Sequence, residues 1–111
     1  MSTNQSSVDY ILDQLASVRD VAVRKMFGEY ALYCGGKVVG LVCDDILFIK
    51  ITDEGKNFVG KYYKEGYAYK GAKISMVMDE DRIDDREWLS EIVQITRDNL
   101  PLLKKKLKKK K

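Results

Sequence analysis

Residues 24–37 read RKMFGEYALYCGGK, and this stretch begins the segment that decides the fold. Two cations and Met-Phe-Gly come first, and small and large side chains then alternate as far as Gly35-Gly36. A Gly-Gly pair accepts positive φ and favours a two-residue hairpin turn. Asp44-Asp45 is a weaker turn signal of the same length. Because β-branched and aromatic residues surround both turns, we predict a three-stranded antiparallel meander from about Met26 to Ile51.

The two turns also predict a register, in which Cys34 faces Lys37 and Cys43 faces Ile46. One face of the meander is then uncharged and is expected to pack against helices: Ala31, Tyr33, Val38, Gly40, Val42, Leu47, Ile49 and Ile51. The opposite face is mixed: Tyr30, Leu32, Cys34, Lys37, Val39, Leu41, Phe48 and Lys50. Its apolar cluster is a candidate partner or dimer face made of Leu32, Val39, Leu41 and Phe48. We expect either a C-terminal element or a second subunit to cover that cluster.

Apolar spacing and capping residues predict the remaining elements. In chain order they are a helix over about 8–17 capped by Ser6 or Ser7, the meander, a short helix within 52–65, a strand over about 73–78, and a helix capped by Asp84 with Glu87 that runs to about 98. The predicted fold class is therefore α+β, two-layer, with an antiparallel sheet and helices packed mainly on one face, in the order α-βββ-α-β-α. We expect a single domain over 1–100 and a lysine-rich tail over 101–111.

Charge is distributed very unevenly along the 111 residues. Of the 20 cations, seven lie in the last eight positions, so the rest of the chain is mildly acidic. These seven are candidates for weak, non-specific nucleic-acid contact: Lys104, Lys105, Lys106, Lys108, Lys109, Lys110 and Lys111. No apolar run is long enough to span a membrane and the N-terminus does not resemble a signal peptide, so we expect a cytoplasmic protein without membrane contact.

The sequence gives little support for a metal site or for a nucleophilic catalytic residue. The chain has no histidine, which excludes Ser/His and Cys/His catalytic pairs and most zinc sites. Cys34 and Cys43 fall at opposite ends of one predicted hairpin and are expected to be small hydrophobic residues without a disulfide. Five acids precede the final helix without calcium-loop spacing: Asp79, Glu80, Asp81, Asp84 and Asp85. We expect no metal, no cofactor and no catalytic residue.

Lysine and tyrosine alternate in KYYKEGYAYKGAK, residues 61–73. Aromatic rings among cations can hold single-stranded nucleic acid or an anionic ligand, but tyrosines can equally anchor a loop to a sheet. Tyr67, Tyr69 and Lys70 are the candidate ligand loop, and a deep pocket shared with Arg24 would favour a small-molecule site.

Several segments together match a known family: RKMFGEYALYCGGKVVGLV, LFIKIT, the acidic turn and a final helix that contains tryptophan. Over about residues 8–100 they resemble the TfoX/Sxy family in its N-terminal-domain type. The positions that match the family motif are Arg24, Lys25, Met26, Phe27, Gly28, Glu29, Tyr30, Lys50 and Thr52. A lysine-rich end after Leu-Pro is similar to that of short members of the family.

The resemblance implies a two-layer α/β domain, a bacterial source and a link to competence, the natural uptake of DNA. In the best-known members, a protein of this type is a coactivator that works with the cyclic-AMP receptor protein and carries a second, helical C-terminal domain. The printed sequence stops at Lys111 without such a domain, so we expect a short, single-domain member. The expected function is a non-enzymatic regulatory or adaptor role in transcription regulation, through an unidentified protein partner. The alternatives are a small-molecule or anion-binding domain that uses the tyrosine–lysine loop, and a homodimeric structural module; a monomer and a homodimer both stay open.

Overall fold

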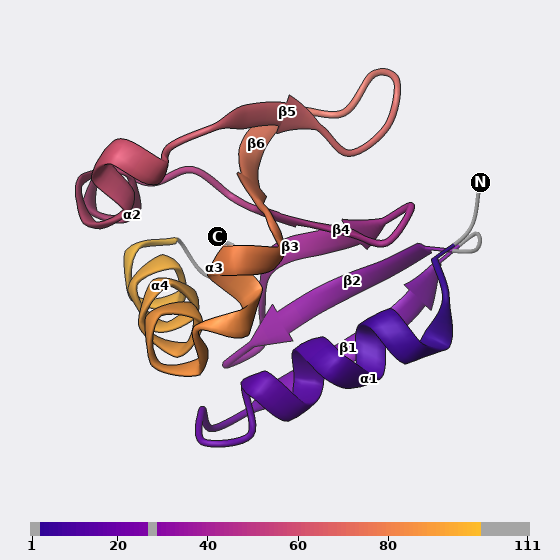
Figure 1. Ribbon diagram of the computed structural model, residues 1–111. Coiled ribbons are helices and arrows are strands. Elements are labelled where there is room, and N and C mark those ends of the chain that lie inside the picture. The colour runs from indigo at the N-terminus through magenta and orange to yellow at the C-terminus, as the bar shows by residue number, and fades with distance from the viewer. Residues whose placement is uncertain (1–2, 27–28, 101–111) are drawn as a thin grey trace, which may run out of the picture.

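The computed structural model describes residues 3–26 and 29–100, and Figure 1 shows their arrangement. The elements in chain order are α1 (Gln5–Gln14), β1 (Val21–Met26), β2 (Glu29–Cys34), β3 (Lys37–Cys43), β4 (Ile46–Ile49), α2 (Asp53–Val59), the short 3-10 helix η1 (Gly60–Tyr62), β5 (Glu65–Tyr67), β6 (Ile74–Met78), α3 (Glu80–Asp84) and α4 (Arg86–Asn99). All strands join one antiparallel sheet in the order β1-β2-β3-β4-β6-β5. The predicted α+β class with an antiparallel meander is confirmed.

Three elements were absent from the sequence-based prediction. β1 precedes the predicted meander and forms one edge of the sheet; of its residues only Val21 and Val23 pack against the core, so its apolar signal is short. β5 is three residues long and lies inside the tyrosine–lysine segment that was expected to be a loop. The expected acidic turn contains the single-turn helix α3, whose N-terminus is capped by the carboxylate of Asp79.

A β-bulge in the first meander hairpin changes which residues face the helices. Near the turn, Tyr33 faces Val38 as predicted, but Leu32 faces Gly40 instead of Val39. The extra residue on β3 inverts the predicted faces of β2, because side chains alternate along a strand. The second hairpin keeps the predicted register, with Cys43 opposite Ile46.

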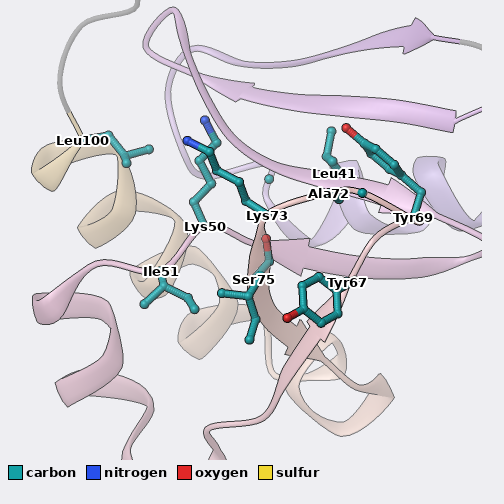
Figure 2. A pocket seen from close by; sticks show the side chains of 12 residues that line it. Leu41, Lys50, Ile51, Tyr67, Tyr69, Ala72, Lys73, Ser75 and Leu100 are labelled. Carbon is teal, nitrogen blue, oxygen red and sulfur yellow. The ribbon is translucent and has the colours of Figure 1, made fainter.

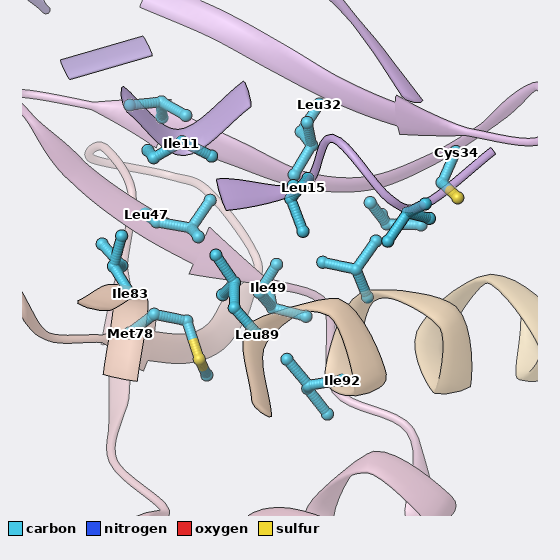
Figure 3. Packing of buried hydrophobic residues seen from close by; sticks show 14 of the residues in the cluster. Ile11, Leu15, Leu32, Cys34, Leu47, Ile49, Met78, Ile83, Leu89 and Ile92 are labelled. Carbon is cyan, nitrogen blue, oxygen red and sulfur yellow. The ribbon is translucent and has the colours of Figure 1, made fainter. Parts of the chain in front are cut away.

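The corrected faces explain the core (Figure 3). β2 contributes Tyr30, Leu32 and Cys34 to the buried cluster, not Ala31 and Tyr33 as predicted. The helices α1 and α4 and Leu15, which directly follows α1, supply the opposing side chains, among which Ile11, Leu15, Leu89 and Ile92 are fully or nearly fully buried. Gly40 permits the bulge, since a Cβ there would lie 2.1 Å from the carbonyl oxygen of Phe48.

Capping residues set the helix boundaries, and for two helices the residue before the first turn differs from the predicted one. α1 begins at Gln5 after Asn4 rather than after Ser6 or Ser7, and it ends at Gln14. Asp85, not Asp84, accepts the backbone N–H of Trp88 and so caps α4. The short helix expected within 52–65 begins after Thr52, whose hydroxyl accepts the N–H of Gly55 at 2.9 Å.

Candidate functional site

The signature residues occupy the first two strands and the exit from the fourth. Arg24, Lys25 and Met26 lie exposed on the edge strand β1, while Phe27 and Gly28 fall outside the described residues. The guanidinium of Arg24 lies 6.0 Å from the ring centroid of Tyr33 on the helix-free face. Arg24 does not line the pockets that contain Tyr67 and Tyr69, so these two pockets lack the lining that would favour a small-molecule site.

Glu29 and Tyr30 bind the segment that leads into α1. The carboxylate of Glu29 accepts the hydroxyl of Thr3 at 2.5 Å and the backbone N–H of Asp44 at 3.0 Å. The hydroxyl of Tyr30 donates to the side chain of Gln5 at 2.7 Å. Thr3 and Asp44 are distant from Glu29 in the chain, so no local sequence pattern indicates these bonds. These two signature residues therefore join α1 to the sheet rather than forming an open site.

The turn at Asp44-Asp45 completes this junction. Both residues have positive φ, 53° and 66°, which matches a tight hairpin turn. Asp45 accepts the backbone N–H of Asn4 at 2.8 Å and the hydroxyl of Ser7 at 3.0 Å. Its carboxylate thus satisfies donors at the exposed start of α1, and these bonds offset the backbone strain at the turn.

The Gly-Gly-Lys hairpin contacts the other end of the fold. The ammonium of Lys37 donates to the carbonyl oxygens of Arg97 and Leu100, at 2.7 Å each. These carbonyls close the final turn of α4, where backbone acceptors have no partner within the helix. The Cδ of Arg97 would lie only 3.1 Å from a Cβ at Gly35, so this glycine lets the hairpin approach α4 closely.

A groove of about 1010 Å³ lies beside β3 and the end of β4 (Figure 2). Its lining comes from β3, the residues after β4, the segment 67–75 and Leu100 at the end of α4. Figure 2 shows Lys50 and Lys73 running alongside each other toward the same side of the groove. The lining residues are Gly40, Leu41, Lys50, Ile51, Tyr67, Tyr69, Gly71, Ala72, Lys73, Ile74, Ser75 and Leu100.

The backbone places the two lysines together. Lys50 follows β4, and its N–H donates to the carbonyl of Val39 at 2.8 Å. Lys73 directly precedes β6, which pairs with β4. Partial burial, and then the charge of Lys73, lower the pKa of Lys50. Within the part of the chain that the structure describes, neither ammonium has a carboxylate within ion-pair distance.

The candidate ligand loop contributes to this groove in part. Tyr67 and Tyr69 line it and keep 62% and 58% of their surfaces exposed. Lys70 lines a smaller hollow on the same loop together with both tyrosines. The loop was predicted from its tyrosines and lysines, but Lys50 was not predicted as its partner, because only the pairing of β4 with β6 brings the two segments together.

The predicted partner face does not form one surface. Leu32 and Val39 belong to the core beneath the helices, as the bulge requires. Phe48 lies on the other face and is buried below β5, where a Cβ at Gly66 would be 3.5 Å from its ring. Leu41 lines the groove. The cover of Phe48 is thus β5, which the sequence analysis had not considered.

A second surface gathers aromatic rings around an arginine, with Phe58 and Tyr62 exposed and Arg82 and Trp88 half-buried. We call it the aromatic–arginine patch: Phe58, Tyr62, Arg82 and Trp88. The guanidinium carbon of Arg82 lies 3.8 Å from the ring centroid of Tyr62 and 5.2 Å from that of Trp88. The rings of Phe58 and Trp88 have centroids 5.4 Å apart. The sequence indicated only an apolar side of the short helix, since the patch unites residues of α2, η1, α3 and α4.

The acids before α4 mostly have structural partners. Asp79 and Asp85 cap helices, and Asp84 accepts the hydroxyl of Tyr10 at 2.5 Å. Among the described residues, no group of three or more acids and cysteines is arranged to hold a metal ion. Both cysteines are buried and free, and burial raises the pKa of Cys43 to about 11.

Comparison with known proteins places this architecture in a family. The model of the TfoX N-terminal domain matches residues 13–99. The chain belongs to the TfoX N-terminal domain family. A curated relative is the "Uncharacterized 12.7 kDa protein in trpE 5' region" of Spirochaeta aurantia, which is 37% identical over 101 residues. The alignment spans 91% of this chain and 86% of that relative.

TfoX N-terminal domains are associated with the regulation of competence and are generally regulatory rather than catalytic. In this member of the family, the described signature residues on β2 bind the start of α1, and Lys50 lines the groove. No described helix has the length and apolar character that crossing a bilayer requires. The cytoplasmic location stays a prediction.

Proposed function

We propose that this TfoX N-terminal domain is a regulatory adaptor that binds a protein partner through the aromatic–arginine patch. The observation that carries the proposal is the exposure of the rings around Arg82: Tyr62 is 42% exposed and Phe58 36%. Trp, Tyr and Arg are the residues most enriched at the energetic centres of protein interfaces. Contiguous apolar surface rimmed by polar residues is a feature of interaction sites.

The geometry of the patch suits an interface because its members are already ordered. The guanidinium of Arg82 lies over Tyr62 at 3.8 Å, and the ring of Trp88 packs against those of Phe58 and Tyr62. Ordering long side chains before association reduces the entropy lost on binding. The association of the family with competence supports a regulatory partner, and the tail would add non-specific attraction to nucleic acid.

Site-specific photo-crosslinking in the native cell tests the contact surface. A photoreactive phenylalanine analogue at Tyr62 should capture one discrete partner, while the same probe at Met26 tests the motif strand β1. In the Tyr62 probe background, Arg82→Glu should lower the crosslinking yield several-fold, and Lys25→Glu, an equal charge change on β1, should leave it unchanged. A crosslink formed only from Met26 would move the contact to β1, and a crosslink only to a second copy would favour the homodimer.

The tail contribution requires a separate measurement. Changing all seven tail lysines to glutamine in the full chain should weaken binding to duplex DNA at low salt and reduce its salt dependence. Unchanged binding, or no binding by the parent chain at low salt, would contradict a nucleic-acid role for the tail.

A further inference from the structure

We propose that the groove between the β3–β4 side of the sheet and the Tyr67–Lys73 loop binds a single strand of nucleic acid. Lys50 and Lys73 would contact its phosphates, and Tyr67 and Tyr69 would stack on its bases. The inference goes beyond the adaptor function, because the groove involves none of the residues of the aromatic–arginine patch. Either proposal can fail without the other.

Two ammonium groups without a described carboxylate partner border the groove. Lys50 and Lys73 extend side by side from neighbouring strands (Figure 2), and no described carboxylate lies within 4.0 Å of either. Their mutual repulsion contributes to lowering the pKa of Lys50. A fold gains no stability from holding like charges together, whereas a phosphate between them would reverse the sign of the interaction. The pair therefore indicates an anionic ligand.

The tyrosines indicate which kind of anion is bound. Tyr67 and Tyr69 are the two most exposed large hydrophobic residues of the described chain, and both border the same groove as the lysines. Unpaired bases present flat faces that stack on such rings, while the backbone follows nearby cations. A base pair inside a duplex does not offer that face. The combination favours a single strand over a duplex and over a simple polyanion.

The size of the groove and its position beside the tail indicate a polymer. The groove of about 1010 Å³ is open and lies at the upper end of the range for small-ligand sites. Leu100 lines it, and the bond from Lys37 to the Leu100 carbonyl fixes this point at 2.7 Å. Lys104 follows only four residues later, within about 14 Å of extended chain. The point where residue 100 leaves the fold therefore borders the proposed path of the strand.

Fluorescence anisotropy with a labelled oligothymidylate and the full chain tests the proposal over a salt series. Lys50→Gln/Lys73→Gln should lower the slope of log K against log salt by about 1.4, because each phosphate contact on a single strand contributes about 0.7. Tyr67→Ser/Tyr69→Ser should weaken binding about ten-fold or more without changing the slope, since stacking does not release counterions. Lys56→Gln/Lys61→Gln on α2 and η1 is the matched control and should leave the affinity and the salt slope at the parent values. Circular dichroism verifies that all variants are folded.

Three competing ligands separate the sources of binding. Excess thymidine monophosphate, a duplex of equal length and polyglutamate should each displace the strand far less effectively than unlabelled oligothymidylate. Equal competition by thymidine monophosphate would make the site a nucleotide pocket, and equal competition by polyglutamate would make it a general anion surface. The proposal is also overturned if the groove variants bind like the parent while neutralising the tail lysines abolishes binding, or if the parent chain does not bind.

Discussion

The ammonium of Lys37 lies 2.7 Å from the carbonyl oxygen of Leu100, so the first hairpin turn of the meander fixes the point from which the basic tail departs. The same ammonium binds the carbonyl of Arg97 at 2.7 Å. One side chain thus satisfies two acceptors at the end of α4, where a positive charge also interacts favourably with the helix dipole.

Replacing Lys37 by methionine should destabilise the domain by about 2 kcal/mol, because two carbonyls lose a charged hydrogen-bond donor. Urea unfolding followed by Trp88 fluorescence measures the change. Lys70→Met, an exposed lysine in the β5–β6 loop, is the control and should alter the free energy of unfolding by less than about 0.5 kcal/mol. Equal effects of the two substitutions would show that Lys37 does not hold the end of α4.

Glu29→Ala should cost about 1–2 kcal/mol, since Thr3 and the Asp44 N–H both lose their acceptor. The local signature is faster amide hydrogen exchange at Asp44 than in the parent chain. Glu91→Ala, on the exposed side of α4, is the control, because it also removes one carboxylate but leaves the Asp44 N–H bonded. If Asp44 exchanges at the parent rate in Glu29→Ala, this signature residue does not hold the β3–β4 turn.

The two glycines of the first hairpin should respond differently to alanine. Both have positive φ, 61° at Gly35 and 80° at Gly36, so either substitution should cost about 1–2 kcal/mol of backbone strain. Gly35→Ala should cost more, because its Cβ would approach the Cδ of Arg97 to 3.1 Å, whereas nothing lies within 4 Å at Gly36. Thermal unfolding of the two variants ranks them, and a less stable Gly36→Ala would contradict the close contact of the hairpin with α4.

Stability should decline at high pH through Cys43. Burial raises the pKa of its thiol to about 11 in the folded chain, above the usual value of about 8.5 for a free cysteine. The folded state therefore binds the thiol proton more tightly than the unfolded state does. The resulting contribution to the free energy of unfolding is fully present below about pH 8.5 and is lost as the pH rises toward 11. The free energy of unfolding should fall less steeply with pH over this window in Cys43→Ala than in the parent chain. Parallel slopes would exclude Cys43 as the linked group.

The meander and the helices could be predicted because their signals are local. Gly35-Gly36 and Asp44-Asp45 mark the turns, and Thr52 caps the short helix expected within 52–65. The bulge at Val39 could not be predicted from the alternation of side chains. Both faces of β2 carry apolar residues, so the sequence is equally consistent with either face of this strand packing against the helices.

The candidate sites depended on contacts between distant segments. The tyrosines and lysines of the β5–β6 loop were visible as a pattern, but Lys50 joins them only through the pairing of β4 with β6. Arg82 and Trp88 likewise meet Tyr62 through the packing of α2 against α4, which no short sequence pattern encodes.

Amide chemical-shift mapping on the isotope-labelled full chain, titrated with oligothymidylate, tests the groove most directly. We predict that the largest changes fall on Lys50, on the loop from Tyr67 to Lys73 and on Leu100, with β1 and the aromatic–arginine patch unaffected. Changes confined to residues 101–111, or centred on β1, would contradict the assignment of the groove as the binding site.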